Sequence, residues 1–128
     1  DLSMEATRTL AEQYGGFYFI TKWPLALKPF YIQPEGKKHS RGFDFMFREV
    51  EMTSGGQRVH DVTLLEQRLR EQGLDPAKFG HYLEPFRYGM PPHGGWGLGL
   101  DRLAMVFSGA QNVRECVLFP RDRNRLTP

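Results

Sequence analysis

Residues 94–103 read Gly-Gly-Trp-Gly-Leu-Gly-Leu-Asp-Arg-Leu, and this stretch decides how the chain should fold. Glycines alternate at positions 95, 97 and 99, so one face of a strand through them carries no side chains. Because glycine weakens a strand, three of them on one face indicate that a flat ligand lies against the backbone. Arg102 follows where the strand should end and a helix begin, so its guanidinium can stack on a ring or bind a phosphate.

A flexible loop is the other interpretation of these glycines. Helical spacing argues for a strand that leads into a helix, because it begins directly after the last glycine, at Leu100, Leu103, Ala104 and Phe107. A P-loop is excluded, since that motif requires G-x-x-x-x-G-K-[ST] and the sequence has no match to it. We therefore expect a nucleotide to lie flat on a sheet.

Composition limits the class of protein. The chain has 128 residues, enough for about one domain, and its 40% hydrophobic and 25% charged residues are ordinary for a soluble globular protein. The formal charge of +2 is too small to indicate nucleic-acid binding by itself. The single cysteine, Cys116, lies in an apolar run, which predicts a buried structural thiol and suits a reducing, cytoplasmic location. No apolar stretch approaches the roughly 20 residues of a membrane span, so no membrane association is expected.

The first half of the chain predicts one helix and several strands. Apolar residues spaced by four predict a helix over residues 2–14, which Gly15 and Gly16 should end. Residues 17–21 predict a short, buried strand, and residues 30–32 a second one. Residues 36–42 are basic and resemble a hairpin connection. Alternation over residues 43–53 predicts one long strand with three phenylalanines on one face.

The second half predicts helices before the glycine strand. Asp61 can cap a helix that runs to Gln72 and ends at Gly73, and Asp75 with Pro76 should begin a short helix. Strands joined by hairpins and then helices favour an α+β fold with an antiparallel sheet over a doubly wound parallel one.

Two acids on the expected long strand are candidate metal ligands. Asp44 and Glu51 are seven positions apart, so a regular strand points them to opposite faces, whereas a bulge could bring them to one site. Carboxylates beside a nucleotide would hold Mg²⁺ on the phosphates, although a solvated strand face is the other interpretation. Residues 54–58 predict a turn. The planar guanidinium of Arg58 suits a carboxylate ligand, and a surface arginine without a ligand is the other interpretation.

These segments together resemble a known family. Residues 94–103 resemble motif 3 of the class II aminoacyl-tRNA synthetases, whose pocket holds ATP. Residues 51–61, Glu-Met-Thr-Ser-Gly-Gly-Gln-Arg-Val-His-Asp, resemble a segment of aspartyl-tRNA synthetases. Residues 88–95 and 118–128 are typical of the archaeal and eukaryotic type of that enzyme. The resemblance covers almost the whole chain and implies part of the class II antiparallel sheet flanked by helices.

The resemblance implies roles for individual residues. Glu51 would be the principal Mg²⁺ ligand on the ATP phosphates, with Ser54 beside it and Asp44 at a further metal. Arg58, with Ser54, would bind the side-chain carboxylate of L-aspartate. The ATP-contacting part of motif 3 would be Gly99, Leu100, Asp101 and Arg102, with Arg102 packed on the adenine and near the γ-phosphate. Glu51 and Arg102 are thus the candidate catalytic residues.

The implied reaction is that of an aspartate–tRNA ligase. ATP would activate L-aspartate to aspartyl-adenylate, and the aspartyl group would pass to tRNA(Asp), or also to tRNA(Asn), depending on the anticodon-binding domain. Residues 1–128 would form the C-terminal half of the catalytic domain, without the anticodon-binding domain, motif 1 or motif 2. We expect the parent to be a homodimer and the isolated fragment to be inactive or very weak.

Two other functions fit the same motifs. One is an asparagine synthetase-like amide ligase, which uses the same adenylate without tRNA. The other is a non-catalytic synthetase paralogue that kept the fold. The presence of Glu51, Ser54, Arg58 and Arg102 together argues against the second alternative, because a relic has no physical need for that polar set.

Overall fold

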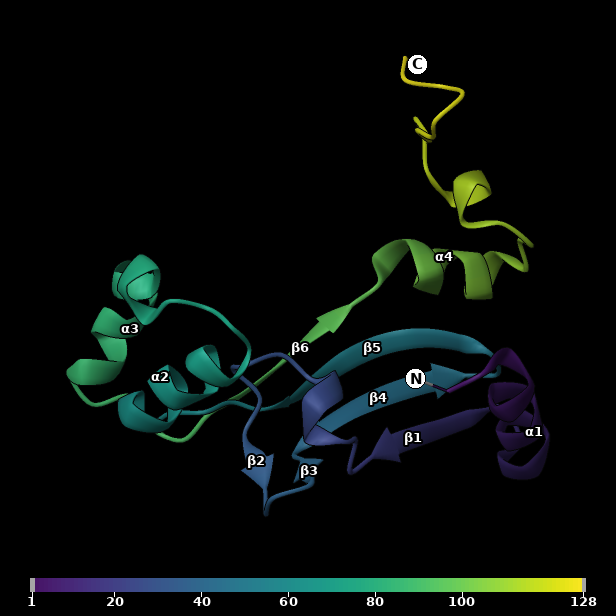
Figure 1. Ribbon diagram of the computed structural model, residues 1–128. Coiled ribbons are helices and arrows are strands. Elements are labelled where there is room, and N and C mark those ends of the chain that lie inside the picture. Colours follow the sequence, from purple (N-terminus) through teal and green to yellow (C-terminus); the bar gives the residue numbers. More distant parts are fainter. Residues whose placement is uncertain (1, 128) are drawn as a thin grey trace.

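The computed structural model describes residues 2–127 and contains a central antiparallel sheet (Figure 1). Its four strands lie in the order β1-β4-β5-β6. A separate two-stranded hairpin precedes β4 in the chain. The strands are β1 (Phe17–Thr21), β2 (Pro34–Glu35), β3 (His39–Ser40), β4 (Gly42–Phe47), β5 (Val50–Gln57) and β6 (Gly94–Leu98). The expected α+β class with an antiparallel sheet is confirmed.

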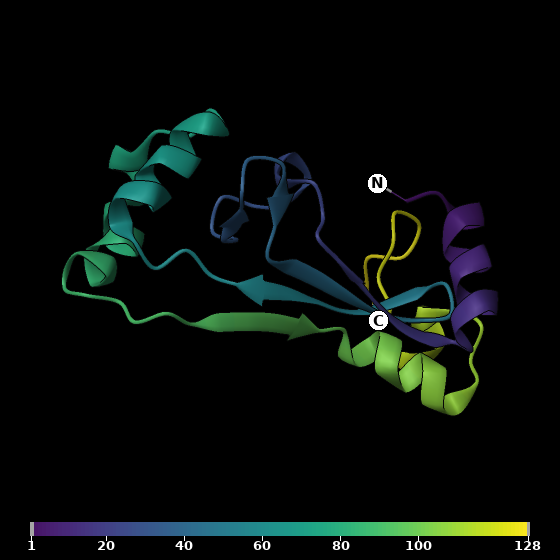
Figure 2. The same cartoon turned by 90° about the horizontal axis from the view of Figure 1, so that it is seen from below.

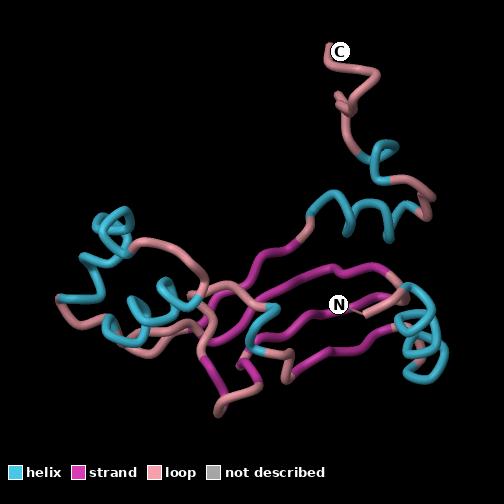
Figure 3. Tube along the Cα trace, in the orientation of Figure 1, coloured by secondary structure: helices cyan, strands magenta, loops and turns pink. Residues whose placement is uncertain are grey.

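Helices lie at both ends of the sheet and along it, as the two views in Figures 1 and 2 and the tube in Figure 3 show. Helix α1 lies at one end, α2 and α3 lie at the other, and α4 follows β6. The α-helices are α1 (Met4–Tyr14), α2 (Val62–Glu71), α3 (Gly80–Arg87) and α4 (Leu100–Ser108); short 3-10 helices cover Leu25–Leu27, Pro76–Phe79 and Val113–Cys116. Between residues 2 and 127, no helix is long and apolar enough to cross a membrane.

Most expected helix boundaries are confirmed by their caps. The Asp61 side chain accepts a hydrogen bond of 2.7 Å from the backbone N–H of Leu64 at the start of α2. The Asp75 carboxylate likewise caps the 3-10 turn before α3. Gly15 ends α1 with φ +72°, a conformation that glycine adopts without strain. The glycine strand and the helix after it are both present, as β6 and α4.

The prediction of one long strand over residues 43–53 was wrong. The chain reverses at Arg48 and Glu49, so β4 and β5 form a hairpin, and β5 then runs on through the residues expected to form a turn at 54–58. Arg48 adopts φ +51° at the reversal. This turn contains no glycine, asparagine or proline, which are the usual signals, and that is why the sequence pattern hid it.

Three smaller expectations also need correction. Residues 17–21 form a strand that is buried on one face only, since Tyr18 is 8% exposed whereas Phe17 and Phe19 are 59% and 63% exposed. Residues 30–32 form no strand; Ile32 makes only an isolated bridge to Arg58. Cys116 is half-buried rather than buried. All three segments are apolar, but apolar character alone does not decide which face of an element is covered.

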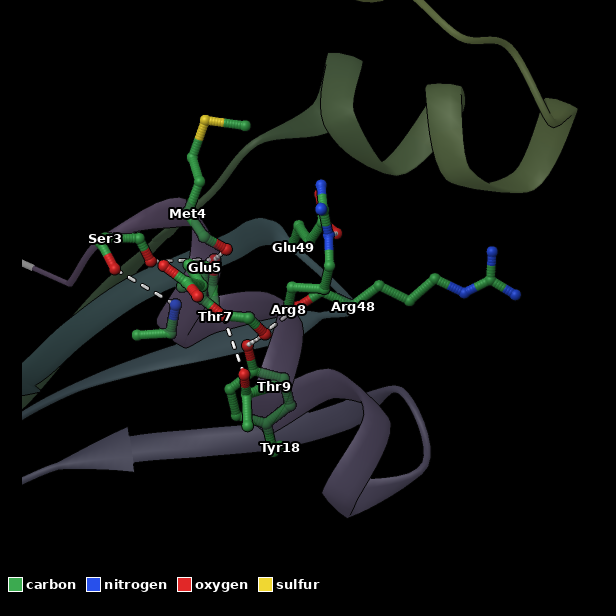
Figure 4. A network of polar contacts seen from close by, with 10 residues as sticks. Ser3, Met4, Glu5, Thr7, Arg8, Thr9, Tyr18, Arg48 and Glu49 are labelled. Atoms are coloured by element: carbon green, nitrogen blue, oxygen red, sulfur yellow. Dashed lines mark hydrogen bonds and ion pairs between the residues drawn. The ribbon is translucent and has the colours of Figure 1, made fainter.

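A polar network joins α1 to the β4–β5 turn (Figure 4). The Tyr18 hydroxyl lies 3.1 Å from the carbonyl oxygen of Thr7 and 2.9 Å from that of Arg48, so it can donate to either. Arg8 Nε donates to Glu49 Oε1 at 2.9 Å. Burial, with a smaller contribution from Glu49, raises the pKa of Tyr18 above its usual value. The network holds the turn in place although the turn lacks the usual residues.

The apolar core lies at the α2–α3 end of the sheet. Its buried members are Val59, Leu65, Leu69, Leu83 and Phe86. The loop residues Phe30 and Tyr31 pack against this core. Because Val59 follows directly after Arg58, the core anchors the end of β5 and the loop that faces it. This anchoring positions the site described next.

Candidate functional site

The β4–β5 hairpin brings the two candidate acids to one face of the sheet. Phe45 pairs with Thr53 and Met46 with Glu51, so Met52 is the extra residue. Glu51 therefore shares the face of Met46, which is also the face of Asp44. Neither possibility for a single strand applies, because the chain reverses between the two acids; the bulge instead places Ser54 opposite Asp44, on the face of Glu51.

Asp44 lies in a nearly buried ion pair. Lys28 Nζ donates to both carboxylate oxygens of Asp44, at 2.9 and 3.0 Å, and Ser54 Oγ donates to Oδ1 at 2.6 Å. The side chains of Lys28 and Asp44 are 12% and 7% exposed. Lys28 also lies over the ring of Trp23, 4.7 Å from its centre. This cluster fixes Ser54 opposite Gly97, its partner on β6.

Arg58 lies between a ring and a glycine. Its guanidinium carbon is 4.4 Å from the centre of the Tyr31 ring. A methyl group on Gly95 would be 3.1 Å from Arg58 Nε, so the glycine backbone passes close to the guanidinium. Together these residues border a pocket of about 340 Å³, which is lined by Lys28, Pro29, Tyr31, Ile32, Ser54, Gly55, Arg58, Trp96 and Gly97. The pocket lining therefore includes the Arg58 guanidinium, the Ser54 hydroxyl and the glycine face of β6.

Glu51 and Arg102 meet at the other end of the same face. Arg102 Nη1 donates to the carbonyl oxygen of Glu51 at 2.6 Å and lies 3.6 Å from its carboxylate. Both side chains are about half exposed. The N–H of Gly99 donates to the carbonyl oxygen of Met52 at 2.9 Å, which joins the start of α4 to the bulge. The side chains of Leu100 and Asp101 are exposed in the first turn of the helix.

The expected site residues thus fall into two groups on one sheet face. One group contains Asp44, Ser54 and Arg58, and the other contains Glu51 and Arg102 with Gly99. Sequence reasoning missed Lys28 and Tyr31; Tyr31 lies in the segment 30–32 that was expected to be a strand, and Lys28 lies just before that segment. The one available signal was a lone lysine within the apolar stretch 25–31.

The donor set determines which metal this face could hold. No group of three acids, histidines or cysteines within residues 2–127 is arranged to bind a metal by protein ligands alone. Glu51 fits Mg²⁺, which usually takes one or two carboxylates and completes its shell with phosphates and water. Both oxygens of Asp44 already accept hydrogen bonds from Lys28, so a metal there would require that ion pair to open. A metal role for Asp44 stays a prediction.

Comparison with known protein sequences agrees with this geometry. The family model for tRNA synthetases class II (D, K and N) matches residues 1–123. An Aspartate--tRNA(Asp/Asn) ligase from Methanosphaera stadtmanae is 53% identical over the whole chain, which spans 30% of that relative. An Aspartate--tRNA(Asp) ligase from Thermoplasma acidophilum is 51% identical over the same shares.

Solved structures give the same result. An aspartyl tRNA synthetase from Entamoeba histolytica superposes with a TM-score of 0.92 at 39% identity, over all of this chain and 28% of that one. An asparaginyl-tRNA synthetase from Pyrococcus horikoshii complexed with asparaginyl-adenylate gives 0.90 at 34% identity, over all of this chain and 30% of that one. With a family model that matches nearly every residue, the chain belongs to the class II tRNA synthetases of the D, K and N group.

Proposed function

We propose that the protein containing this chain is an aspartate–tRNA ligase, which activates L-aspartate with ATP and transfers it to tRNA. The chain spans about 30% of the relatives it matches, so the activity is proposed for the whole protein. The observation that carries the proposal is the Arg58 guanidinium, held at a pocket that is bordered by the glycine face of strand β6. Relatives at 51–53% identity that are named aspartate ligases support it.

Arg58 would select the amino acid. A guanidinium offers paired N–H donors in one plane, which matches the two oxygens of a side-chain carboxylate. A carboxamide has only one such oxygen, and its NH₂ group would oppose the arginine donors. Ser54, fixed by Asp44, would add a hydroxyl beside the bound aspartate. The two residue groups would then hold the aspartate side chain and the outer phosphates of ATP at different places, which leaves the α-carboxylate free to reach the α-phosphorus.

Glu51 and Arg102 would bind ATP together with Gly99, Leu100 and Asp101. Arg102 would pack against the adenine and contact the γ-phosphate, since its half-exposed guanidinium lies at the start of α4. The bare backbone of Gly97 leaves open space on this face, which suits a flat ring. When bound through Glu51, Mg²⁺ would neutralise phosphate charge during the reaction.

No side chain needs to act as a nucleophile in the first step. The α-carboxylate of aspartate attacks the α-phosphorus of ATP, the bond to the bridging oxygen breaks, and pyrophosphate leaves. Arg58 would hold the aspartate in line, and Arg102 would stabilise negative charge on the leaving group. In the second step, a hydroxyl of the terminal adenosine of tRNA takes the aspartyl group and AMP leaves.

The partners follow from this reaction. We propose tRNA(Asp) as the substrate; the relatives include ligases named for tRNA(Asp) alone and for tRNA(Asp/Asn), so tRNA(Asn) is a second candidate. We further propose that residues 1–128 contribute the C-terminal part of the catalytic domain, and that the whole protein acts as a homodimer in the cytoplasm.

Aspartate-dependent ATP–pyrophosphate exchange tests the proposal. The whole protein should exchange with aspartate and not with asparagine, and Arg58→Leu should abolish exchange at unchanged stability. Subsequent charging of tRNA distinguishes a tRNA ligase from an amide ligase, which would form free asparagine instead. A folded whole protein that shows no exchange would contradict the proposal and favour a non-catalytic paralogue.

A further inference from the structure

Two parts of this chain bound the Arg58 guanidinium, a ring at one face and the strand β6 at the Nε–Nη2 edge. The Tyr31 ring lies on one side, with 4.4 Å between the ring centre and the guanidinium carbon. Gly95 approaches the same group from β6, where an added methyl would be 3.1 Å from Nε and 3.2 Å from Nη2. A cation so close to an aromatic face is attracted by the negative charge of the ring. The ring and the strand therefore fix the plane of the guanidinium.

The donors at the edge of Arg58 are not used by acids of this chain. Within residues 2–127, no Asp or Glu forms an ion pair with Arg58, whereas Arg8, Arg68, Arg70, Arg87, Arg102 and Arg114 each have an acidic partner. An arginine placed in a pocket without an acid is available for an anion from outside. The ring and the glycine thus orient a guanidinium that borders the pocket and forms no ion pair within residues 2–127.

Tyr31 itself is anchored from the core rather than from the site. Its carbonyl oxygen accepts a hydrogen bond of 2.9 Å from the N–H of Val59, a fully buried core residue. The adjacent Phe30 packs edge-on against Phe79 and Tyr82, with ring centres 5.6 and 5.8 Å apart. The Tyr31 ring is consequently a fixed surface against which Arg58 rests.

We propose that Tyr31 is a positioning residue that sets the preference of the site for a carboxylate over a carboxamide. The inference rests on the proposed function of Arg58. A guanidinium confined between a ring and a backbone can offer only its in-plane donors, and these match two carboxylate oxygens. Without the ring the guanidinium can tilt. One of its N–H donors can then bond to the oxygen of a carboxamide, while the NH₂ group of the carboxamide lies away from the other donors. The preference for aspartate over asparagine then falls, even though the arginine is still present.

Steady-state exchange kinetics on the whole protein test this role. Tyr31→Leu should raise KM for aspartate by about tenfold and lower the aspartate-to-asparagine ratio of kcat/KM by a similar factor. The kcat for aspartate should change by less than about threefold, because the ring does not contact reacting atoms. Tyr31→Phe keeps the ring and should restore both values to within about threefold of the unaltered protein.

Two further variants separate positioning from folding. Phe79→Leu is the matched control, because it removes a ring that packs on Phe30 and the core, with 5.6 Å between the ring centres of Phe79 and Phe30, and not on Arg58. It should lower stability and leave the ratio unchanged. If Tyr31→Leu does not fold, Gly95→Ala is the substitute, since its methyl would lie 3.1 Å from Nε and 3.2 Å from Nη2 and would displace that edge of the guanidinium. It should also raise KM for aspartate and lower the ratio.

The outcomes distinguish this inference from the proposed function. If the unaltered protein shows no exchange with aspartate, the proposed function fails and this inference fails with it. If the unaltered protein exchanges and the variant at Tyr31 or Gly95 keeps the ratio, only the inference is overturned. It is also overturned if Phe79→Leu lowers the ratio as much as Tyr31→Leu, because that result indicates a general effect of core packing.

Discussion

Arg102 donates a hydrogen bond of 2.6 Å to the carbonyl oxygen of Glu51, 51 positions earlier in the chain, while its guanidinium lies 3.6 Å from the Glu51 carboxylate. The first residue is in the opening turn of α4 and the second is beside the bulge of β5. This contact connects the helix to the sheet at the point where we propose that ATP binds. The two charges hold each other in place and remain half exposed.

Replacement of Arg102 should affect ATP far more than aspartate. In Arg102→Ala, we expect KM for ATP to rise by about 10- to 100-fold, because a charge-assisted hydrogen bond to phosphate is lost. KM for aspartate should change by less than about threefold, since Arg58 and Ser54 lie in the other residue group. Exchange kinetics with each substrate varied in turn measure both constants.

Arg87→Ala is the matched control for this substitution. Arg87 is also a half-exposed arginine, and it pairs with Glu66 on α2 instead of facing the site. It should leave both constants unchanged. Equal losses for ATP and aspartate in Arg102→Ala would contradict a specific contact between Arg102 and the nucleotide.

The extent of the β-sheet could be predicted only in part from the sequence. The alternation of Phe43, Phe45 and Phe47 correctly predicts a strand, because its period of two is a local property. The reversal at Arg48 depends on hydrogen bonds to β1 and its entry: Tyr18 donates to the Arg48 carbonyl oxygen, and Gly16 accepts from the Arg48 N–H. The alternation of apolar residues in a short stretch of sequence contains no information on contacts with residues so far away in the chain.

The residues of the candidate site could likewise be predicted only in part from the sequence. Glu51, Arg58 and Arg102 could be predicted, because each lies in a segment with a family resemblance. Lys28 and Tyr31 could not, because they reach the site only through the pairing of their loop with the end of β5. The shared face of Glu51 and Ser54 depends on one extra residue in β5, and a spacing rule cannot locate a bulge.

The ion pair between Lys28 and Asp44 should be a large contributor to stability. Lys28→Met leaves the Asp44 carboxylate buried without its cation and should lower the free energy of unfolding by about 3–5 kcal/mol. Lys28→Met combined with Asp44→Leu should recover much of that loss, since both buried charges are then removed. Urea unfolding of the two variants measures the difference.

Magnesium distinguishes this structural role of Asp44 from a metal-binding one. Lys38→Met, which changes an exposed lysine of the β2–β3 hairpin, should have almost no effect and serves as the control. Added Mg²⁺ should not stabilise Lys28→Met if Asp44 only supports Ser54. Stabilisation by Mg²⁺ in that variant and not in Lys38→Met would instead support Asp44 as a metal ligand.

Gly55 and Gly97 lie on adjacent strands and should respond differently to an added methyl group. At Gly55 the methyl would be 2.5 Å from Trp96 Cβ and 2.7 Å from the carbonyl oxygen of Gly95, so Gly55→Ala should destabilise the sheet by about 3 kcal/mol. At Gly97 no atom of the described residues lies within 4 Å of the methyl. Gly97→Ala should therefore fold normally.

Gly97→Ala should still weaken nucleotide binding. Gly97 pairs with Ser54 and shares its face, so the methyl would project toward the proposed ATP and aspartate pocket. We expect KM for ATP to rise by roughly tenfold, comparable to a misfit of one methyl group in a binding pocket. Thermal unfolding and exchange kinetics are measured together. Unchanged kinetics in a stable Gly97→Ala protein would contradict a ligand that lies flat on β6.

Acid should weaken the contact between Glu71 and Arg68. Hydrogen bonds from Gln67 and Arg68 lower the pKa of Glu71 below its usual value of 4.5. The carboxylate therefore stabilises the fold above pH 4.5, and this contribution is lost as the pH falls below 4.5 through the lowered pKa. Arg68 is only 5% exposed and its Nε has no hydrogen-bond partner among residues 2–127, so it depends on the donation of 2.6 Å from Nη1 to Glu71.

Glu71→Gln should lower the free energy of unfolding by about 1 kcal/mol at pH 7, because Arg68 keeps a hydrogen bond but loses a charge that solvent already screens in part. Its stability should then fall less steeply than that of the unaltered protein between pH 5 and pH 3. Glu84→Gln changes an exposed carboxylate on α3 and should follow the unaltered protein over this range. Urea midpoints at each pH measure the slopes. Parallel curves for Glu71→Gln and the unaltered protein would show that Glu71 does not carry the acid sensitivity of this end of the molecule.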